Sequence, residues 1–162
     1  MQITKATMAD LDTIMAIYEH AKAFMVATGN GGQWADGYPQ RELIAAGITK
    51  GHCYLCLDDG ETVATFYFAV EQEPTYQHLD GGEWINDLPY GVLHRIAVRS
   101  NKKGIATYCL EWCFAQTGNM RIDTHENNAP MRRVIDKNGY QYCGIIYVRD
   151  GTPRMAFQKT AS

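Results

Sequence analysis

The stretch Tyr90-Gly-Val-Leu-His-Arg-Ile-Ala-Val98, followed directly by Arg99-Ser-Asn-Lys-Lys-Gly-Ile-Ala106, decides how this chain folds. The first half is apolar at most positions, which is typical of a β-strand that is buried on both faces. The second half is a short basic turn, and apolar residues at helical spacing begin at Ile105. The stretch therefore predicts a strand, a tight turn and a helix in immediate succession.

A turn of this kind is a candidate phosphate-binding site. The N-terminus of a helix presents backbone N–H groups that have no intrahelical acceptor, and the helix dipole adds partial positive charge there. Gly104 has no Cβ and so permits close approach of a ligand, while Arg99, Lys102 and Lys103 add positive charge. A solvated basic turn that merely starts a helix is the alternative, and this segment alone leaves both interpretations open.

The flanking sequence alternates between helical and strand-like patterns. We expect strands over residues 2–6, 52–57, 62–70, 90–98, 120–124, 141–148 and 154–157, and helices over 7–25, 41–48, 104–117 and 128–138. Helices are interspersed with strands that are partly linked as hairpins, which favours a mixed sheet. We therefore expect an α/β (α+β) fold, with a mostly antiparallel central sheet that carries helices on both faces.

Composition limits the class of protein. The chain has 162 residues, of which 46% are hydrophobic, and this fits a single domain over residues 1–162. A net charge of −3 argues against a nucleic-acid partner bound through bulk electrostatics. The sequence has neither a signal peptide pattern nor the run of roughly 20 apolar residues that a membrane span needs. We expect a cytoplasmic protein, either a monomer or a homodimer.

The five cysteines are expected to be buried, reduced thiols. Cys53 and Cys56 form a CxxC pair inside an apolar, strand-like run, and Cys109 and Cys113 lie four residues apart on one helix. A structural zinc site needs a second pair of ligands at loop-like spacing, and none is present. We therefore predict no metal site.

The segment around Gly104 resembles the GNAT superfamily of acetyltransferases. The pattern of that family is Arg/Gln-x-x-Gly-x-Gly/Ala after a strand that ends in apolar-Ala-Val. Here Asn101-Lys-Lys-Gly104-Ile-Ala106 follows Ile96-Ala97-Val98. The expected order of elements follows the GNAT order over essentially the whole chain. A second family spacing is matched by Asn128, Met131 and Lys137-Asn138-Gly139-Tyr140.

The resemblance implies a transferase, an N-acetyltransferase that uses acetyl-CoA as co-substrate and a small-molecule or peptide amine as acceptor. Backbone groups at the end of the 90–98 strand would contact pantetheine, the amides of the turn would hold the diphosphate, and an Asn side chain would contact the cofactor. The cofactor-binding residues implied in this way are Ile96, Ala97, Val98, Asn101, Lys102, Lys103, Gly104, Ile105, Ala106, Thr107 and Asn128.

Two departures from the family pattern leave other functions open. Asn101 stands where Arg or Gln is usual. Ile135 stands seven residues after Asn128, where many members have a Tyr that protonates the departing thiolate. A non-catalytic CoA-binding or regulatory module of the same fold is therefore the first alternative. A nucleotide binder of another α/β fold is the second, but the chain has no Walker or Rossmann motif to support it.

Amine acetylation needs a base, because the pKa of an alkylamine is about 10. His94 is the best candidate, since an imidazole titrates near neutral pH. In a regular strand His94 shares a face with Val92, Ile96 and Val98. A histidine that is hydrogen-bonded inside the core is the alternative interpretation.

Glu71 and Tyr140 complete the predicted catalytic residues. Glu71 ends the neighbouring strand and could bind the amine or act as a base through water, and a solvated strand end is the alternative interpretation. Tyr140, with Tyr142 and Tyr147, is a candidate for the general acid that the family pattern lacks here. Tyrosines in strands are also common packing residues.

Aromatic residues in two irregular segments are candidates for the acceptor site. Trp34 and Tyr38 lie in the connection between the first two helices, which in the GNAT fold lies over the acceptor. Trp84 lies in the polar stretch 71–89, a second possible wall of that site. A packed loop that covers the core is the alternative for both segments.

Overall fold

The order of helices and strands in the computed structural model is the order that the sequence predicts. The structure describes residues 1–31, 34 and 37–161. The strands are β1 (Gln2–Lys5), β2 (Cys53–Asp58), β3 (Glu61–Val70), β4 (Gly91–Val98), β5 (Asn119–Thr124), β6 (Gln141–Tyr147) and β7 (Pro153–Thr160). The helices are α1 (Leu11–Ala27), α2 (Arg41–Thr49), α3 (Ile105–Thr117) and α4 (Ala129–Lys137), with 3-10 turns at Met8–Asp10 and Pro74–Tyr76.

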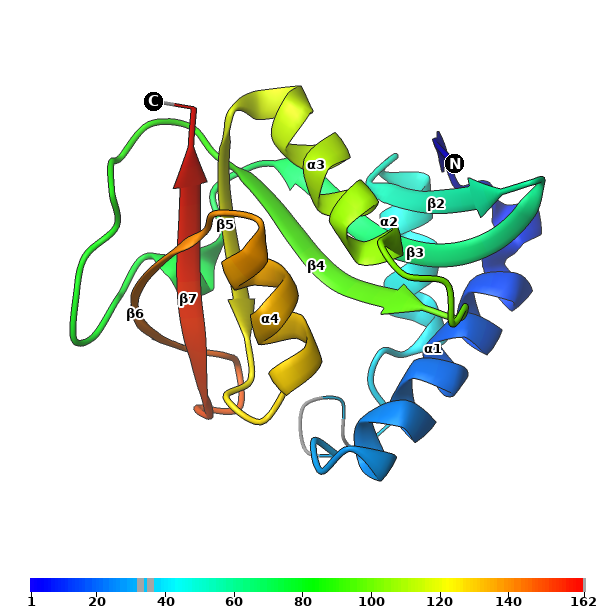
Figure 1. The fold of residues 1–162 in the computed structure, drawn as a ribbon, viewed down its shortest axis with the longest axis horizontal. Helices are drawn as coiled ribbons and strands as arrows, with labels where there is room; N and C mark the ends of the chain where they lie inside the picture. Colours follow the sequence, from blue (N-terminus) through cyan, green and yellow to red (C-terminus); the bar gives the residue numbers. More distant parts are fainter. Residues whose placement is uncertain (32–33, 35–36, 162) are drawn as a thin grey trace. The chain divides into compact units, whose positions relative to one another are not determined.

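The strands are hydrogen-bonded in the order β1-β2-β3-β4-β5-β7-β6 (Figure 1). The pairs β1–β2, β2–β3, β5–β7 and β6–β7 are antiparallel. Strands β4 and β5 are parallel, and their pairing covers only Gly91 with Met120 and Val92 with Arg121. The expectation of a mixed, mostly antiparallel sheet is thus confirmed.

The chain divides into two compact units, which we describe separately. Unit 1 comprises residues 1–68 and 94–109, and unit 2 comprises residues 69–93 and 110–162. Strand β4 and helix α3 each contribute residues to both units. The expectation of one domain over residues 1–162 stays a prediction.

The main core of unit 1 is formed by α1 and α2 against one face of its strands. Ile14 and Ile17 of α1 are fully buried there, beside Cys53 and Leu55 of β2. The opposite face of β2 carries Cys56, whose pKa is lowered by a hydrogen bond with the Cys109 thiol of α3. Successive side chains of a strand point to opposite faces, so this unit has helices on both faces, as predicted.

The core of unit 2 is built from β5, β6, β7 and α4. Ile122, Ile135 and Ile146 are fully buried in it. The long segment that follows β3 is tied to this unit, because the backbones of Asp80 and Ile145 exchange two hydrogen bonds of 2.9 Å. The segment passes so close to β6 that a β-carbon on Gly82 would overlap a backbone carbonyl.

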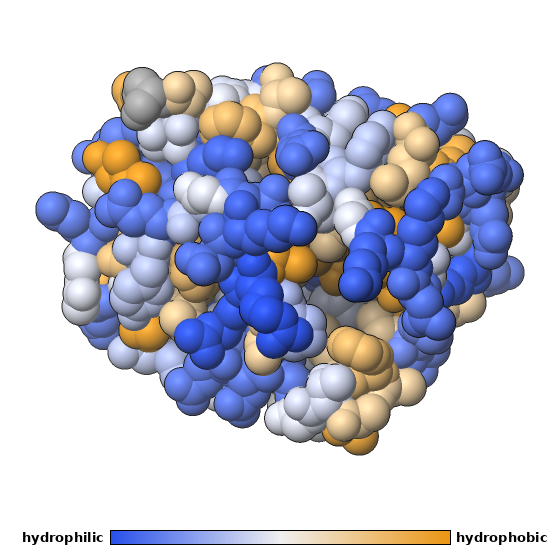
Figure 2. Space-filling model, in the orientation of Figure 1, coloured by the Kyte–Doolittle hydropathy of each residue, from blue (hydrophilic) through white to orange (hydrophobic). Residues whose placement is uncertain are grey.

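All five cysteines are buried, as the sequence predicts. Large apolar side chains that remain exposed, such as Phe24, Val26 and Leu88, are scattered along the chain. Figure 2 accordingly shows hydrophilic and hydrophobic residues interspersed on one face. Within the described ranges, no helix is both long enough and apolar enough to cross a bilayer.

Candidate active site

The turn between β4 and α3 joins a strand directly to the N-terminus of a helix, as the sequence predicts (Figure 1). Gly104 has a φ of +90°, a left-handed conformation that glycine adopts at little cost. Its carbonyl accepts the first intrahelical hydrogen bond, from the Tyr108 N–H at 2.9 Å. A β-carbon built on Gly104 would have no atom within 4 Å, so this side of the turn is open to a ligand.

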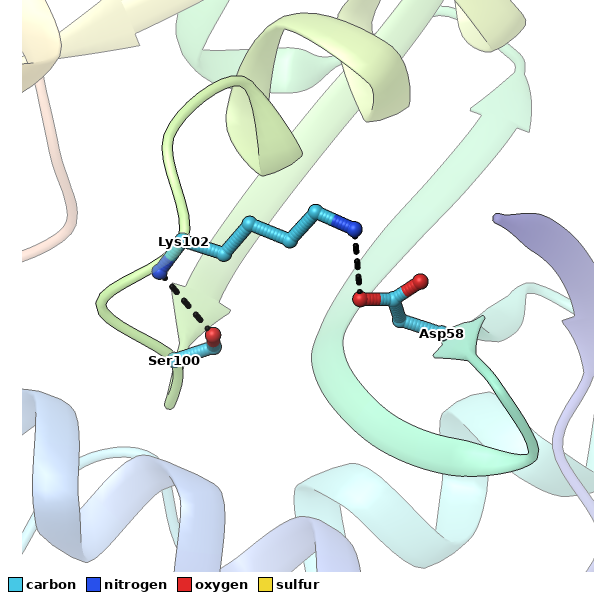
Figure 3. Close-up of polar contacts among 3 residues, drawn as sticks. All are labelled: Asp58, Ser100 and Lys102. Carbon is cyan, nitrogen blue, oxygen red and sulfur yellow. Dashed lines mark hydrogen bonds and ion pairs between the residues drawn. The ribbon is translucent and has the colours of Figure 1, made fainter.

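Lys102 is held in the turn by two contacts, which Figure 3 shows. Its backbone N–H donates to Ser100 Oγ at 3.0 Å. Its side chain extends to the end of β2, where Nζ lies 2.8 Å from Asp58 Oδ2. The hydrogen bond from Lys102 lowers the pKa of Asp58. The ammonium group therefore points to the β2–β3 hairpin, whereas the backbone of Lys102 stays in the turn.

The turn can receive an anion through its main chain. The first N–H groups of a helix have no intrahelical acceptor, and in α3 these begin at Ile105, directly after the open side of Gly104. Asn101, Lys102, Lys103 and Gly104 are exposed. Main-chain donors, the helix dipole and exposed cationic residues together fit a phosphate or diphosphate group.

Strand β4 contains an irregularity that the sequence pattern did not predict. Arg95 has a φ of +55°, which lies outside the range of a regular strand. Its backbone carbonyl accepts a hydrogen bond from the Tyr18 hydroxyl of α1 at 2.8 Å. The expectation of unbroken alternation from Val92 to Val98 is therefore wrong at Arg95.

Three side chains of unit 1 lie around the ring of Tyr67. Tyr67 is opposite Cys53 in the β2–β3 ladder, so it lies on the face that carries the α1–α2 core. The ring of His94 lies 5.6 Å from that of Tyr67, and the ring of His52 lies 5.5 Å from it. The guanidinium carbon of Arg95 lies 5.0 Å from the same ring. His94 and Arg95, which are consecutive in β4, thus both contact the ring of Tyr67.

Two predicted acceptor residues also lie in this part of unit 1. Trp34 is buried and packs edge-on against Tyr18, with ring centroids 5.4 Å apart. Tyr38 is 36% exposed, and its hydroxyl helps to raise the pKa of Arg95 against the opposing effect of burial. Residues 32–33 and 35–36 of the same connection lie outside the described residues.

The remaining predicted site residues belong to unit 2. Trp84 donates from Nε1 to the Tyr76 carbonyl at 2.9 Å, and the Arg121 guanidinium lies 4.2 Å from its ring. Asn128 caps α4, since its Oδ1 accepts the Met131 N–H at 3.2 Å. Tyr140 is buried and its hydroxyl has no hydrogen-bond partner, so that burial raises its pKa. Glu71 is half-buried just after β3.

Sequence reasoning missed Arg95, Tyr67 and Tyr18. A signal for Arg95 exists in the printed sequence, because a charged residue inside a strand that is otherwise apolar is rarely buried without a purpose. No comparable signal marks Tyr18 or Tyr67, since tyrosines at core-facing positions are ordinary packing residues.

Comparison with solved structures finds strong similarity. The chain is 33% identical to an acetyltransferase of the GNAT family from Streptococcus agalactiae, with a TM-score of 0.91, over 99% of this chain and 95% of the other. An acetyltransferase of the GNAT family from Bacillus cereus is 22% identical, with a TM-score of 0.65, over 99% of this chain and 97% of the other.

A third similar structure holds a CoA thioester. It is the GNAT-like decarboxylase GphF in complex with isobutyryl-CoA, which is 14% identical, with a TM-score of 0.70, over 100% of both chains. The likenesses to this protein and to the Bacillus cereus protein concern the fold alone. No protein-family model and no curated protein matches the sequence.

Proposed function

Because the chain belongs to the GNAT family of acetyltransferases, we propose that it transfers the acetyl group of acetyl-CoA to the amino group of a small molecule or peptide. One observation carries the proposal. The turn after β4 is open at Gly104, which has a φ of +90°, and leads directly into the N-terminus of α3. This arrangement suits the diphosphate of CoA.

The cofactor would be bound mainly by main-chain groups. The amides from Asn101 to Thr107 would hold the diphosphate, and that of Lys102 would exchange its hydrogen bond to Ser100 Oγ for one to the ligand. Backbone groups of Ile96, Ala97 and Val98 would pair with the pantetheine arm in the manner of an added strand. The assignment of a cofactor contact to Asn128 stays a prediction, and its Oδ1 already accepts a hydrogen bond from Met131.

In the proposed reaction, the amine attacks the thioester directly within a ternary complex. His94 would take the proton from the ammonium form of the acceptor. The free amine would then form the C–N bond, the C–S bond would break, and the second proton of the nitrogen would pass to the departing sulfur through water. The products are an N-acetyl compound and CoA. This route requires no covalent intermediate on the protein, which agrees with the burial of all five cysteines.

The thiolate can depart without protonation by a strong general acid. A thiol has a pKa of about 8.5, so the thiolate is a tolerable leaving group at neutral pH. Ile135, which replaces the usual family Tyr, is fully buried. Tyr140 as the general acid stays a prediction, and so do Glu71 as a second base and Trp84 as part of the acceptor site.

An assay of the purified chain with acetyl-CoA and a panel of amines tests the proposal. Release of the CoA thiol, together with a mass gain of one acetyl group on the acceptor, would support acetyl transfer. Tight binding of acetyl-CoA without turnover of any amine would instead favour the non-catalytic CoA-binding module. Absence of CoA binding would contradict both functions.

A further inference from the structure

The backbone at Arg95 is held in an unfavourable conformation. Apart from glycines, Arg95 and Asp59 are the described residues with a positive φ, and Asp59 lies in the tight turn between β2 and β3. A left-handed residue inside a strand is disfavoured and persists only where its surroundings fix it. Here the Tyr18 hydroxyl, which is buried in the α1–α2 core, holds the Arg95 carbonyl at 2.8 Å.

This backbone geometry directs the Arg95 side chain into an aromatic environment. The guanidinium lies over the ring of Tyr67 at 5.0 Å, a cation–π arrangement. A β-carbon built on Gly47 of α2 would lie 3.9 Å from Nη2, in ordinary van der Waals contact, so Gly47 borders the group. Nε is buried and has no hydrogen-bond partner. A ligand would therefore meet the terminal nitrogens, beside the Tyr18 and Tyr38 hydroxyls that hydrogen-bond the guanidinium.

Arg95 has no paired carboxylate among residues 1–31, 34 and 37–161. Burial lowers its pKa, but the hydroxyls of Tyr18 and Tyr38 more than offset this, so the guanidinium remains charged. In the part of the chain that the structure describes, the ion pairs involve other residues, and no carboxylate pairs with Arg95. A partly buried charge without a counter-charge is costly, and a charged partner would remove that cost.

We infer that Arg95 recognises a carboxylate on the acceptor, so that the substrate is an amino acid or a close analogue that carries both an amine and a carboxylate. The inference rests on the proposed function. The planar fork of a guanidinium matches a carboxylate through two parallel hydrogen bonds. His94, the proposed base, is the preceding residue and contacts the same Tyr67 ring. One small molecule can therefore present its amine to His94 and its carboxylate to Arg95.

The same arrangement disfavours other acceptors. A polyamine would bring additional positive charge to Arg95, which costs binding energy. A peptide N-terminus has an amide in place of the nearby carboxylate and offers the guanidinium no anion there. Trp34 and Tyr38, which the sequence predicted to line the acceptor site, both lie around the Tyr18–Arg95 pair.

The test compares amino acids with the amines that lack only the carboxylate, such as phenylalanine with phenethylamine and histidine with histamine. We expect kcat/KM for acetylation to favour the best amino acid over its amine by about 100-fold or more, the usual size of a paired carboxylate contact. Arg95→Met keeps the length of the side chain and its packing on Tyr67. It should abolish this preference, leave turnover of the amines within about threefold, and leave the affinity for CoA unchanged.

Two further variants keep the test decisive. Arg95→Lys retains the charge without the planar fork and should lose about tenfold on amino acids alone, even if the methionine variant does not fold. Arg121→Met is the matched control, since Arg121 also lies over aromatic rings and has a buried, unpartnered Nε. It should retain the preference ratio. Equal use of amino acids and amines by the parent protein, or a full preference in Arg95→Met, would overturn the inference.

Equilibrium binding separates this inference from the proposed function. Calorimetry with the CoA-bound protein and the same amino acids should give binding that Arg95→Met removes. If that binding is found without acetyl transfer, the proposed reaction fails and the role of Arg95 stands. If transfer occurs without a carboxylate preference, only the role of Arg95 fails. If neither binding nor transfer of an amino acid is found, the role of Arg95 is wrong, and the proposed reaction is wrong as well only if the other amines are not acetylated.

Discussion

At the scale of single residues, the candidate chemistry depends on a departure from regular strand geometry. His94 was predicted to be the base from its position in the strand and from the chemistry of an imidazole. The strand pattern alone placed His94 on the same face as Ile96 and Val98. The left-handed backbone at Arg95 changes that assignment, because His94 and Arg95 both contact Tyr67. Alternation is a property of regular strands, so the pattern could not reveal where the strand departs from it.

Replacement of His94 by Gln tests the proposed base. The amide keeps a polar side chain of similar size but cannot accept the proton of the amine, so we expect kcat/KM to fall about 100-fold or more at neutral pH. The parent enzyme should lose activity as pH falls and the base becomes protonated, and His94→Gln should lose that limb of the profile. Steady-state kinetics from pH 5.5 to about 9 checks both expectations.

His52 offers a control for the His94 variant. Its ring lies 5.5 Å from Tyr67, almost the same separation as that of His94. If His94 acts only by packing on this ring, His52→Gln and His94→Gln should have similar effects. A parent-like rate and pH profile for His94→Gln would rule out His94 as the base.

At the scale of elements, the strand–turn–helix unit was predictable and its side-chain contacts were not. The apolar run, the basic turn and Gly104 lie next to one another in the sequence, so local rules suffice to place them. By contrast, the ion pair of Lys102 with Asp58 joins residues 44 positions apart. The hydrogen bond from Tyr18 to Arg95 spans 77 positions. Such contacts depend on how elements pack, which no local pattern specifies.

A substitution at Gly104 tests the turn. Gly104→Ala forces a side chain into a left-handed conformation, which should lower the free energy of unfolding by about 1 kcal/mol. The added methyl group would also stand where the diphosphate is proposed to bind. We therefore expect the affinity for acetyl-CoA, measured by calorimetry, to fall by about tenfold or more.

Gly151→Ala provides the matched control for this element. Gly151 has a φ of +82°, and a β-carbon built on it would likewise have no atom within 4 Å, but it lies in the turn between β6 and β7. The two variants should lose similar stability, and only Gly104→Ala should lose affinity for acetyl-CoA. A similar loss of affinity in both would show that backbone strain, rather than the phosphate site, is responsible.

At the scale of the whole chain, the sequence determined the element order well because helices and strands alternate with clear turn signals. The Asp58-Asp59-Gly60 hairpin formed where expected, with positive φ at Asp59 and Gly60. The predicted ends of most elements differ from the observed ends by one or two residues, as fraying and capping allow. The segment 71–89 was predicted only as irregular, because its bridge to Ile145 and the packing of the Trp84 ring against Tyr76 are tertiary contacts.

Stability should fall at alkaline pH. Burial raises the pKa of Tyr18, Tyr76 and Tyr140 in the folded state. Their contribution to stability is complete below the unfolded pKa of about 10 and is lost as pH rises above it, because only the unfolded chain then ionises. We expect a loss of about 1.4 kcal/mol per buried tyrosine for each pH unit above about 10, measured by urea denaturation.

Tyr140 allows this pH dependence to be isolated. Its buried hydroxyl has no partner, so Tyr140→Phe should not destabilise the protein at pH 8 but should reduce the alkaline loss. Tyr142, which is 48% exposed, supplies the control variant Tyr142→Phe, whose alkaline loss should match the parent. An unchanged alkaline loss in Tyr140→Phe would contradict this explanation.

The most direct measurement compares the affinity of the parent protein for acetyl-CoA and for S-acetylpantetheine, which has the same thioester and arm but no diphosphate. Calorimetry should show binding of acetyl-CoA at one site per chain and binding of S-acetylpantetheine weaker by about 100-fold or more, because the main-chain donors from Asn101 to Thr107 then have no anion to hold. Equal affinity for the two compounds, or no heat of binding with acetyl-CoA, would contradict the account.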